Sequence, residues 1–447
     1  MISHPQKMTT TRTLKGAVTA LAVGLVLTLP TPGANATLTR VPPWPTGVTG
    51  AIPTSIQAPA TTTSEDYLAT MRKRLNRRLG LDALGSNVSV RVEDLASGTV
   101  EFAHRSNVGM IPASTQKTAT ALAALSAVGP DHLMPTVVRL NEDVGTITVV
   151  GGGDALLSSA NLDELAQRVA ERLSGDRDQK YDVTYDDSLF AAPQSPRGWI
   201  PSYYTAYASR PTALTRDLAP VADPSADAAK FFRKRLKSKG VPVNPGASRG
   251  SAGQGSTEIA RFAGHTMAEV LSPMLTYSDN SIAENVIRHV ALARGSATTA
   301  GAAAQAVRDE LAELDIAMRS FSPADGSGLS RADRVTTKTL VSITRAAVDP
   351  RDPRLATGFR TSSYPIAGKT GTLGSRFRDR ATSCAAGRIM AKTGTLSDVV
   401  ALSGITSSTD GKLRAFAIVV NNKPSWASID ATRAGVDRIA TAITGCR

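Results

Sequence analysis

The pattern of apolar and polar positions is regular near both ends of the sequence. Between residues 64 and 84, apolar side chains recur at helical spacing among many arginines, which predicts an amphipathic helix with a solvated basic face. Valines at every second position from 88 to 92 predict a strand, and Ser97 and Gly98 provide a turn before a second strand at 99–102. We therefore expect a hairpin here.

The C-terminal part of the chain shows the clearest strand patterns. Residues 399–405 and 413–420 are apolar runs separated by a polar turn, and an extended segment is expected before them at 388–393. From 429 to 443, apolar residues return at helical spacing and predict a helix that covers a sheet. We expect the N-terminal hairpin and these strands to form one antiparallel sheet with helices on its faces, which is an α+β fold.

Residues 130–262 differ in character from the segments on either side. They contain a short strand pattern at 145–150, a turn of three glycines and an aspartate at 151–154, a helical pattern at 162–173 and many prolines. The three glycines are not followed by Gly-Lys-Ser or Gly-Lys-Thr, so they predict a turn after a strand rather than a phosphate-binding loop. We expect a smaller, inserted α/β region. Further helices are expected at 267–275, 281–293, 302–314 and 336–348.

The first part of the chain is not expected to belong to the folded core. Residues 1–36 combine a basic start, an apolar run and an Ala-Asn-Ala sequence, which is typical of an export signal; an uncleaved anchor is the alternative. Residues 37–63 are rich in proline and threonine and predict an extended linker. The rest is expected to comprise a first part of one domain at 64–129, the inserted region at 130–262 and a second part of that domain at 263–447.

Composition places the chain among ordinary globular proteins. Of its 447 residues, 41% are apolar and 20% are charged, which allows more than one domain and a large core. The net charge of +13 suits contact with anionic polymers of a cell wall, and a generally basic surface without such a partner explains it equally well. No interleaving of aromatic and basic residues supports nucleic-acid binding.

Histidine and cysteine usage indicates no metal site. The five histidines are scattered without the spacing of metal ligands, and two cysteines cannot form a zinc site, so we expect neither a metal nor another cofactor. In an exported chain, Cys384 and Cys446 could form one disulfide, but sequence alone does not show that they meet.

The most reactive arrangement in the sequence is Ser114 followed by Lys117 at the start of a predicted helix that ends near Gly129. Helical spacing places the Lys117 amine within reach of the Ser114 hydroxyl, so the pair could act as nucleophile and base. The positive end of the helix would also stabilise a developing alkoxide. The alternative is a surface helix with a serine near its cap, so the assignment depends on partners elsewhere in the chain.

Two further motifs provide such partners. Ser278-Asp279-Asn280 opens a predicted helix and supplies a hydroxyl and an amide, whereas Ser159 belongs to a similar sequence in the inserted region that we discount. Lys-Thr-Gly occurs twice, beginning at Lys369 and at Lys392. We choose Lys392, because it precedes two strands and can lie on a strand edge, while Lys369 runs into a polar turn.

The order of these motifs is that of penicillin-binding proteins and class A β-lactamases. The sequence resembles in particular the class C low-molecular-mass penicillin-binding proteins, exported D-alanyl-D-alanine carboxypeptidases and endopeptidases. The resemblance covers about residues 65 to 445 and implies a penicillin-binding, β-lactamase-like transpeptidase fold. In that family the stretch aligned with 368–373 typically lacks Lys-Thr-Gly, which also favours Lys392. The matching blocks are 113–117, 151–154, 186–190, 278–285, 325–331 and 391–404.

This resemblance implies a role for each motif residue. Ser114 is expected to attack the carbonyl of the penultimate D-alanine, and Lys117 to accept its proton. Lys392 and partial burial are expected to lower the pKa of Lys117. Ser278 would relay a proton to the leaving amine, and Asn280 would hold a substrate carbonyl or Lys117. The N–H groups of Ser114 and Thr395 are expected to form the oxyanion hole. Lys392 and Thr393 are expected to bind the terminal carboxylate, and Gly394 to let the substrate backbone come close. Arg331 and Asp186 are expected to recognise the third residue of the stem peptide.

The expected partners are peptidoglycan stem peptides and β-lactam antibiotics, outside the cytoplasm. A structural salt bridge is the alternative for Arg331, and a structural role is the alternative for Asp186. A β-lactamase is the competing enzyme, but no Glu-x-x-Leu-Asn segment is found to position a deacylating water. A non-catalytic wall-binding protein is the competing class; it leaves the reactive motifs unexplained.

Overall fold

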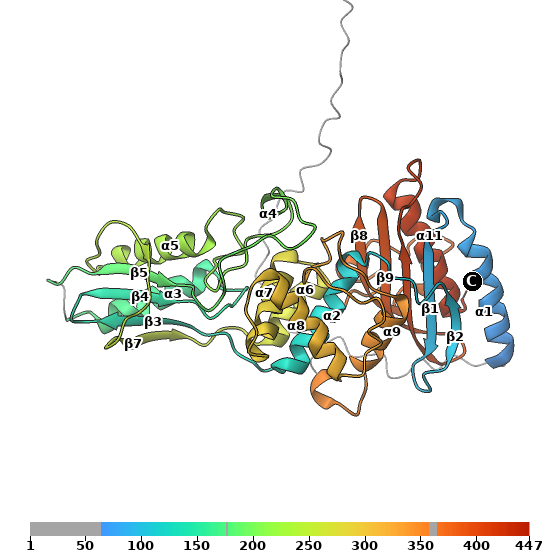
Figure 1. The fold of residues 1–447 in the computed structure, drawn as a ribbon, viewed down its shortest axis with the longest axis horizontal. Helices are drawn as coiled ribbons and strands as arrows, with labels where there is room; N and C mark the ends of the chain where they lie inside the picture. The colour runs from blue at the N-terminus through green and yellow to red at the C-terminus, as the bar shows by residue number, and fades with distance from the viewer. Residues whose placement is uncertain (1–63, 176–177, 357–363, 447) are drawn as a thin grey trace, which may run out of the picture. The chain divides into compact units, whose positions relative to one another are not determined.

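The computed structural model describes residues 64–175, 178–356 and 364–446. The expected export signal at 1–36 and the linker at 37–63 lie outside these residues. Within them, no helix has both the length and the apolar composition needed to cross a membrane. Two five-stranded sheets and the helices around them form an α+β architecture, as predicted (Figure 1).

The first sheet joins strands from the two ends of the described chain. Its strands are β1 (Val88–Asp94), β2 (Val100–His104), β8 (Ile389–Leu396), β9 (Val399–Ser407) and β10 (Leu413–Val420). Their order is β2-β1-β10-β9-β8, and all neighbours are antiparallel. The predicted pairing of the hairpin with the C-terminal strands is confirmed, with Val90 opposite Ile418. Strand β8 forms one edge of the sheet, where a ligand can approach.

Alternation along the strands gives this sheet two buried faces. The valines of β1 pack on one face with α1 (Ser64–Leu79) and α11 (Ile429–Thr444). Alanines of β9 and β10 on the other face share a core with α2 (Gln116–Ala127) and α9 (Thr337–Ala346). Burying one large apolar side chain contributes about 1.5–3 kcal/mol, so both faces stabilise the sheet. The first helix is shorter than predicted, because Gly80 begins a turn after Leu79.

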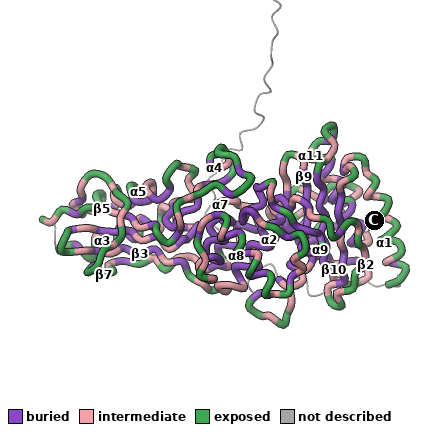
Figure 2. The backbone as a smooth tube through the Cα atoms, in the orientation of Figure 1, coloured by how far each residue is buried: buried purple, intermediate pink, exposed green. Residues whose placement is uncertain are grey.

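Three helices pack with α2 into a buried layer (Figure 2). They are α6 (Met267–Thr276), α7 (Asn280–Ala293) and α8 (Ala300–Glu313), within a few residues of the predicted bounds. The side chains of Thr266, Asp279 and Thr299 cap them by accepting backbone N–H groups of the first turns. The cap at Asp279 fixes the start of α7, where the second motif lies.

The second sheet is formed entirely by strands between residues 136 and 262. They are β3 (Thr136–Asn141), β4 (Thr146–Val150), β5 (Asp182–Asp186), β6 (Ser248–Arg249) and β7 (Thr257–Phe262). The order is β6-β5-β4-β3-β7, with parallel pairing from β4 to β6. Helices α3 (Ser159–Arg172) and α5 (Pro224–Ser238) share its core. The sheet has the α/β character expected of 130–262; the division into separate domains stays a prediction.

Several elements of this region were not predicted. Strands β3, β5 and β7 are short, and their patterns did not stand out among prolines and polar residues. Helix α5 has a clear start signal, because Asp223 caps it and Pro224 occupies the first turn. A short helix, α4 (Tyr203–Ala206), was also missed. The three glycines at 151–153 follow β4 as irregular backbone, and the turn comes after them at Ala155 and Leu156, so the turn predicted at 151–154 was wrong by a few residues.

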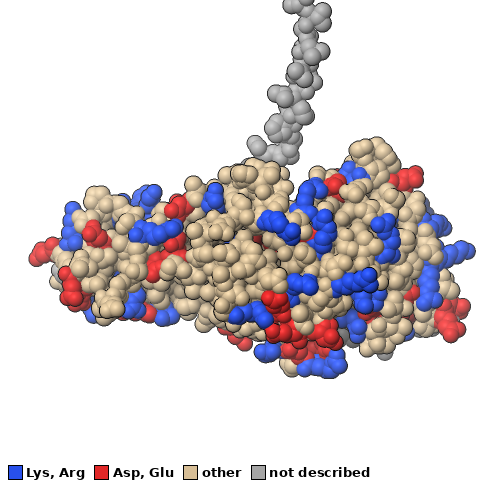
Figure 3. Space-filling model, viewed as in Figure 1, with Lys and Arg blue, Asp and Glu red and all other residues tan. Residues whose placement is uncertain are grey.

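Cys384 and Cys446 form a disulfide, which settles the open question of their pairing. The bond connects the 3₁₀ turn η4 (Ser383–Ala385) to Cys446, two residues after the end of α11. Charged side chains of both signs are interspersed on the face shown in Figure 3, without one continuous basic stripe on that face.

Candidate active site

Ser114 lies on a short 3₁₀ turn, η2 (Ala113–Thr115), that leads directly into α2. Ala113 has a φ of 47°, a left-handed conformation that is unfavourable for a residue with a Cβ. The glycine-rich segment 325–331 packs against this turn, and a Cβ on Gly328 would lie 1.9 Å from the Ala113 carbonyl oxygen. Glycine is therefore required at 328, and the two segments together fix the position of Ser114.

The Lys117 side chain is fully buried and directed at Ser114. Its Nζ lies 3.2 Å from Ser114 Oγ, 2.7 Å from Asn280 Oδ1 and 2.7 Å from the Ser327 main-chain oxygen. Because an amine has a limited number of hydrogen-bonding positions, these three partners define its orientation. The structure thus brings together the Ser114–Lys117 turn, Asn280 and Ser327 from three separate segments.

Burial lowers the pKa of Lys117 to about 8, while the carboxylates of Asp325, Asp279, Glu284 and Asp333 act in the opposite direction. The main cause is therefore burial, which was predicted in part from the sequence, whereas the charge of Lys392, which was also invoked, is not among the main causes. An amine with this pKa is substantially neutral near pH 8 and can accept a proton from a serine.

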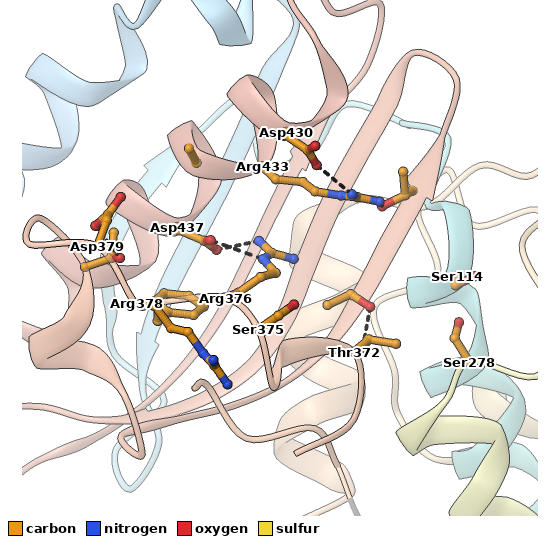
Figure 4. A pocket seen from close by; sticks show the side chains of 15 residues that line it. Ser114, Ser278, Thr372, Ser375, Arg376, Arg378, Asp379, Asp430, Arg433 and Asp437 are labelled. Carbon is orange, nitrogen blue, oxygen red and sulfur yellow. Dashed lines mark hydrogen bonds and ion pairs between the residues drawn. The ribbon is translucent and has the colours of Figure 1, made fainter. Parts of the chain in front are cut away.

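Ser278 and Asn280 lie at the junction of α6 and α7. Ser278 has a φ of 65°, and the Asp279 side chain next to it caps α7 by accepting the Ile282 N–H at 2.9 Å. This local geometry allows Ser278 to line the same cleft as Ser114 (Figure 4). The Asn280 amide donates to the Tyr207 carbonyl at 2.9 Å, so its oxygen stays directed at Lys117.

Edge strand β8 forms the opposite wall. Lys392 is fully buried and donates to the Thr393 carbonyl at 3.0 Å. Burial lowers the pKa of Lys392 well below its usual value, and the charge of Lys117 lowers it further. A Cβ on Gly394 would lie 2.8 Å from the Pro112 carbonyl oxygen, so glycine allows β8 to pack against the Ser114 turn. Thr393 and Thr395 line the cleft.

These segments enclose a cleft of about 630 Å³, a volume suited to a small peptide. Ser114 and Ser278 lie at one end, next to Thr372, whose hydroxyl is 2.7 Å from that of Thr393 (Figure 4). The lining residues are Ser114, Ser278, Thr372, Ser375, Arg376, Phe377, Arg378, Asp379, Thr382, Thr393, Thr395, Asp430, Arg433, Ala434 and Asp437.

Three residues considered from the sequence lie elsewhere. Lys369 is exposed in a turn and does not line the cleft. Arg331 donates to Ser397 Oγ at 2.7 Å and pairs with Asp398 at 2.6 Å, at the turn after β8. Asp186 ends β5 and accepts the Ser188 N–H at 3.0 Å. Neither Arg331 nor Asp186 is among the cleft-lining residues, so their substrate contacts stay predictions.

The sequence missed the residues that support Lys117 from behind and those at the far end of the cleft. Glu284 lies on α7 among apolar residues and is fully buried, and its carboxylate binds the segment that contains Ser327. A charged residue on the apolar face of a predicted helix was the available signal. At the far end of the cleft, Arg376 and Arg433 come from segments that are far apart in sequence. Only the folded structure brings these two segments together, so the sequence offered no signal for them.

No group of histidine, cysteine, aspartate and glutamate side chains in the described parts of the chain is arranged to hold a metal ion. The chemistry that the described residues can provide is nucleophilic attack by Ser114, proton transfer by Lys117 and Ser278, and binding of anionic groups at β8.

Comparison with known proteins agrees with this geometry. Residues 71–219 and 217–443 match the D-Ala-D-Ala carboxypeptidase 3 (S13) family. The chain is 30% identical to the carboxypeptidase DacB of Mycolicibacterium smegmatis, over 91% of this chain and 90% of that protein. It is 28% identical to a D-alanyl-D-alanine carboxypeptidase of Actinomadura sp., over 86% of each chain.

Solved structures show the same fold. The crystal structure of penicillin binding protein 4 from Haemophilus influenzae superposes with a TM-score of 0.70 at 21% identity, covering 83% of this chain and 99% of that one. A predatory peptidoglycan endopeptidase from Bdellovibrio bacteriovorus superposes with a TM-score of 0.52 at 15% identity, covering 80% and 92% of the two chains. The predicted penicillin-binding, β-lactamase-like fold is therefore confirmed.

Proposed function

This chain belongs to the D-Ala-D-Ala carboxypeptidase 3 (S13) family and is a serine D,D-peptidase, and we propose that it cleaves peptidoglycan stem peptides through an acyl-enzyme on Ser114. The observation that carries the proposal is the contact, at 3.2 Å, between Ser114 Oγ and a buried Lys117 amine whose pKa burial lowers to about 8. A hydroxyl next to such an amine is an activated nucleophile, and a structural serine has no need of one.

In the first step, Ser114 Oγ attacks the carbonyl carbon of the penultimate D-alanine, and its proton passes to Lys117 Nζ. In this proposal, the backbone N–H groups of Ser114 and Thr395 donate hydrogen bonds to the oxyanion. The terminal carboxylate of the substrate binds at Thr393 and Lys392. Its negative charge stabilises the protonated, ammonium form of Lys392. Gly394 allows the substrate backbone to lie close to β8.

In the second step, the carbon–nitrogen bond breaks, and a proton from Lys117 reaches the leaving amine through Ser278. Asn280 holds the Lys117 amine during both transfers, because its oxygen accepts from Nζ at 2.7 Å. Water then attacks the acyl-enzyme and releases the shortened peptide and free Ser114. β-Lactams follow the first step, but their leaving group stays attached, so the acyl-enzyme persists. We propose penicillins as covalent inhibitors on this basis.

The substrate determines where the protein acts. Peptidoglycan lies outside the cytoplasm, which supports the proposal that residues 1–36 direct export and that the mature chain is secreted or loosely associated with the membrane. The surplus of basic over acidic residues supports an additional, weaker attraction to anionic wall polymers. Recognition of the third stem-peptide residue by Arg331 and Asp186 also belongs to this proposal.

The direct test is release of D-alanine from a synthetic pentapeptide that ends in D-Ala-D-Ala. The purified protein should release D-alanine, and Ser114→Ala should abolish release while retaining the thermal unfolding transition of the wild type. Nitrocefin distinguishes the β-lactamase alternative, because a peptidase acylates and stalls whereas a β-lactamase turns over. Sustained nitrocefin turnover without D-alanine release would contradict the proposal. A folded protein inactive toward both compounds would indicate a wall-binding protein.

A further inference from the structure

The cleft that contains Ser114 continues beyond the Lys-Thr-Gly strand into a charged region. We define this charged end by six cleft-lining residues, Arg376, Arg378, Asp379, Asp430, Arg433 and Asp437. They come from the segment before β8 and from the first turns of α11 (Figure 4). None of the motifs that identify the catalytic residues includes any of them, and the reaction on a terminal D-alanine does not use them.

The proposed function fixes which part of a substrate faces the charged end, and the inference rests on it. The scissile carbonyl lies at Ser114, and the carboxylate of the leaving residue lies at Thr393. A D-alanine leaving group ends at this carboxylate and a methyl group. The space beyond Thr393 is therefore left empty by a stem peptide with a free D-alanine terminus. Only a leaving residue whose side chain continues further can fill it.

Two ion pairs line the charged end, one buried and one exposed to solvent. Arg376 binds both carboxylate oxygens of Asp437, and the two side chains are only 12% and 8% exposed. Arg433 pairs with Asp430 at 2.9 Å and also donates to the Thr395 hydroxyl at 3.3 Å. The charged end is thus directly continuous with the strand that binds the carboxylate of the leaving residue.

The outer part of the charged end keeps side chains that a ligand can reach. Arg378 is exposed, and its guanidinium donates to the Gly374 carbonyl at 2.6 Å. Asp430 is 87% exposed on its side chain, so its pair with Arg433 is weak and can be exchanged for a ligand. Arginines of this kind bind carboxylates, and the neighbouring aspartates accept amide N–H groups or an ammonium. This mixture of charges suits a peptide that carries free carboxylates.

We propose that the charged end is the binding site for the leaving strand of a peptide cross-link, that is, for a second stem peptide whose amino group forms the scissile bond. Arg378 and Arg433 pair with carboxylates of that strand, and Arg376 with Asp437 forms the fixed wall against which it lies. The charged end then determines how well the enzyme cleaves cross-links compared with free D-alanine termini. Endopeptidase action depends on it, and carboxypeptidase action does not.

The test compares two substrates with the same donor stem, a pentapeptide ending in D-Ala-D-Ala and a cross-linked dimer, by chromatography of the products. Arg378→Gln removes a charge that pairs with the leaving strand, and Arg378→Glu reverses that charge. Each variant should lower kcat/KM for the dimer by roughly tenfold, the value of one charged contact. D-Alanine release should change by less than about twofold, which also shows that the variants fold. Arg172→Gln, an exposed arginine in the last turn of α3 and outside the cleft lining, is the matched control and should leave the ratio of the two activities unchanged.

Three results would overturn the proposal. The first is a wild-type enzyme that releases D-alanine but leaves the dimer intact. The second is a loss of the same factor on both substrates in Arg378→Gln and Arg378→Glu. The third is a change of the activity ratio in Arg172→Gln as large as in Arg378→Gln. Failure of the proposed function itself is seen separately, because the wild type would then cleave neither substrate.

Discussion

The Glu284 carboxylate holds Ser327 in position behind the candidate active site. One of its oxygens accepts the N–H groups of Gly326 and Ser327, each at 3.0 Å. The carbonyl of Ser327 in turn accepts a hydrogen bond from Lys117 Nζ at 2.7 Å. Glu284 does not line the cleft, so it is a positioning residue that acts on the candidate base through the glycine-rich segment.

Removing this support should slow acylation. In Glu284→Ala the two N–H groups lose their acceptor, the Ser327 carbonyl loses its fixed position, and penicillin acylation should fall roughly tenfold to a hundredfold. Glu284→Gln keeps an oxygen that can accept both N–H groups and should retain the rate within about threefold. A purely structural role predicts a lower melting temperature with an unchanged acylation rate in the folded fraction, and that result would contradict the positioning role.

The acylation rate should depend on pH through Lys117. Burial lowers its pKa from 10.5 to about 8, and only the neutral amine accepts the Ser114 proton. The proton is therefore bound, and the base inactive, below this pKa. We expect the second-order rate constant for penicillin acylation to fall about tenfold per pH unit well below pH 8 and to level off above it. Stopped-flow measurements with a fluorescent penicillin between pH 6 and 9.5 test this. A rate that stays flat or decreases toward high pH would exclude Lys117 as the base.

The two Lys-Thr-Gly sequences should differ sharply in importance. Lys392 is buried on β8 behind the cleft, whereas Lys369 is exposed in a turn. Lys392→Ala should reduce acylation roughly a hundredfold, because a charge next to the substrate carboxylate is lost. Lys369→Ala is the matched control and should change it by less than about twofold. Equal losses in the two variants would show that the motif assignment is wrong.

The disulfide should stabilise the far wall of the cleft. It joins residues separated by 62 positions and holds η4 near the end of α11. A loop of this length corresponds to about 4 kcal/mol in the loop-entropy model. Replacing both cysteines by serine should lower the midpoint of urea unfolding accordingly, whereas adding a reductant should have no further effect on the variant. An unchanged midpoint would mean that packing alone secures this region.

Much of the first sheet and its helices could be predicted from local sequence patterns. The valines of β1 and the apolar runs of β9 and β10 could be read directly, because each lies on a sheet with buried faces. The second sheet was harder, since β5 and β7 are short and partly exposed. Parallel pairing of β4 with β5 also depends on segments far apart in sequence, which periodicity does not relate.

In the candidate site, too, local contacts could be predicted from the sequence, whereas contacts between distant segments could not. Ser114 and Lys117 are three residues apart on one helical turn, so their contact could be predicted from spacing. Asn280 came from a motif, but its hydrogen bond to Lys117 requires the packing of α7 against α2. Burial was expected to lower the pKa of Lys117, but the complete burial of its side chain could not be predicted, because it depends on the whole fold. For the same reason, no pattern in the sequence indicated that Arg433 lies next to Thr395.

The central claim is that Ser114 is the residue that becomes acylated. Incubation with benzylpenicillin, followed by proteolysis and peptide mass spectrometry, locates the adduct directly. The account predicts one penicilloyl group on the peptide that contains Ser114 and none in Ser114→Ala. An adduct on Ser278 or any other residue, or continued acylation of Ser114→Ala, would contradict it.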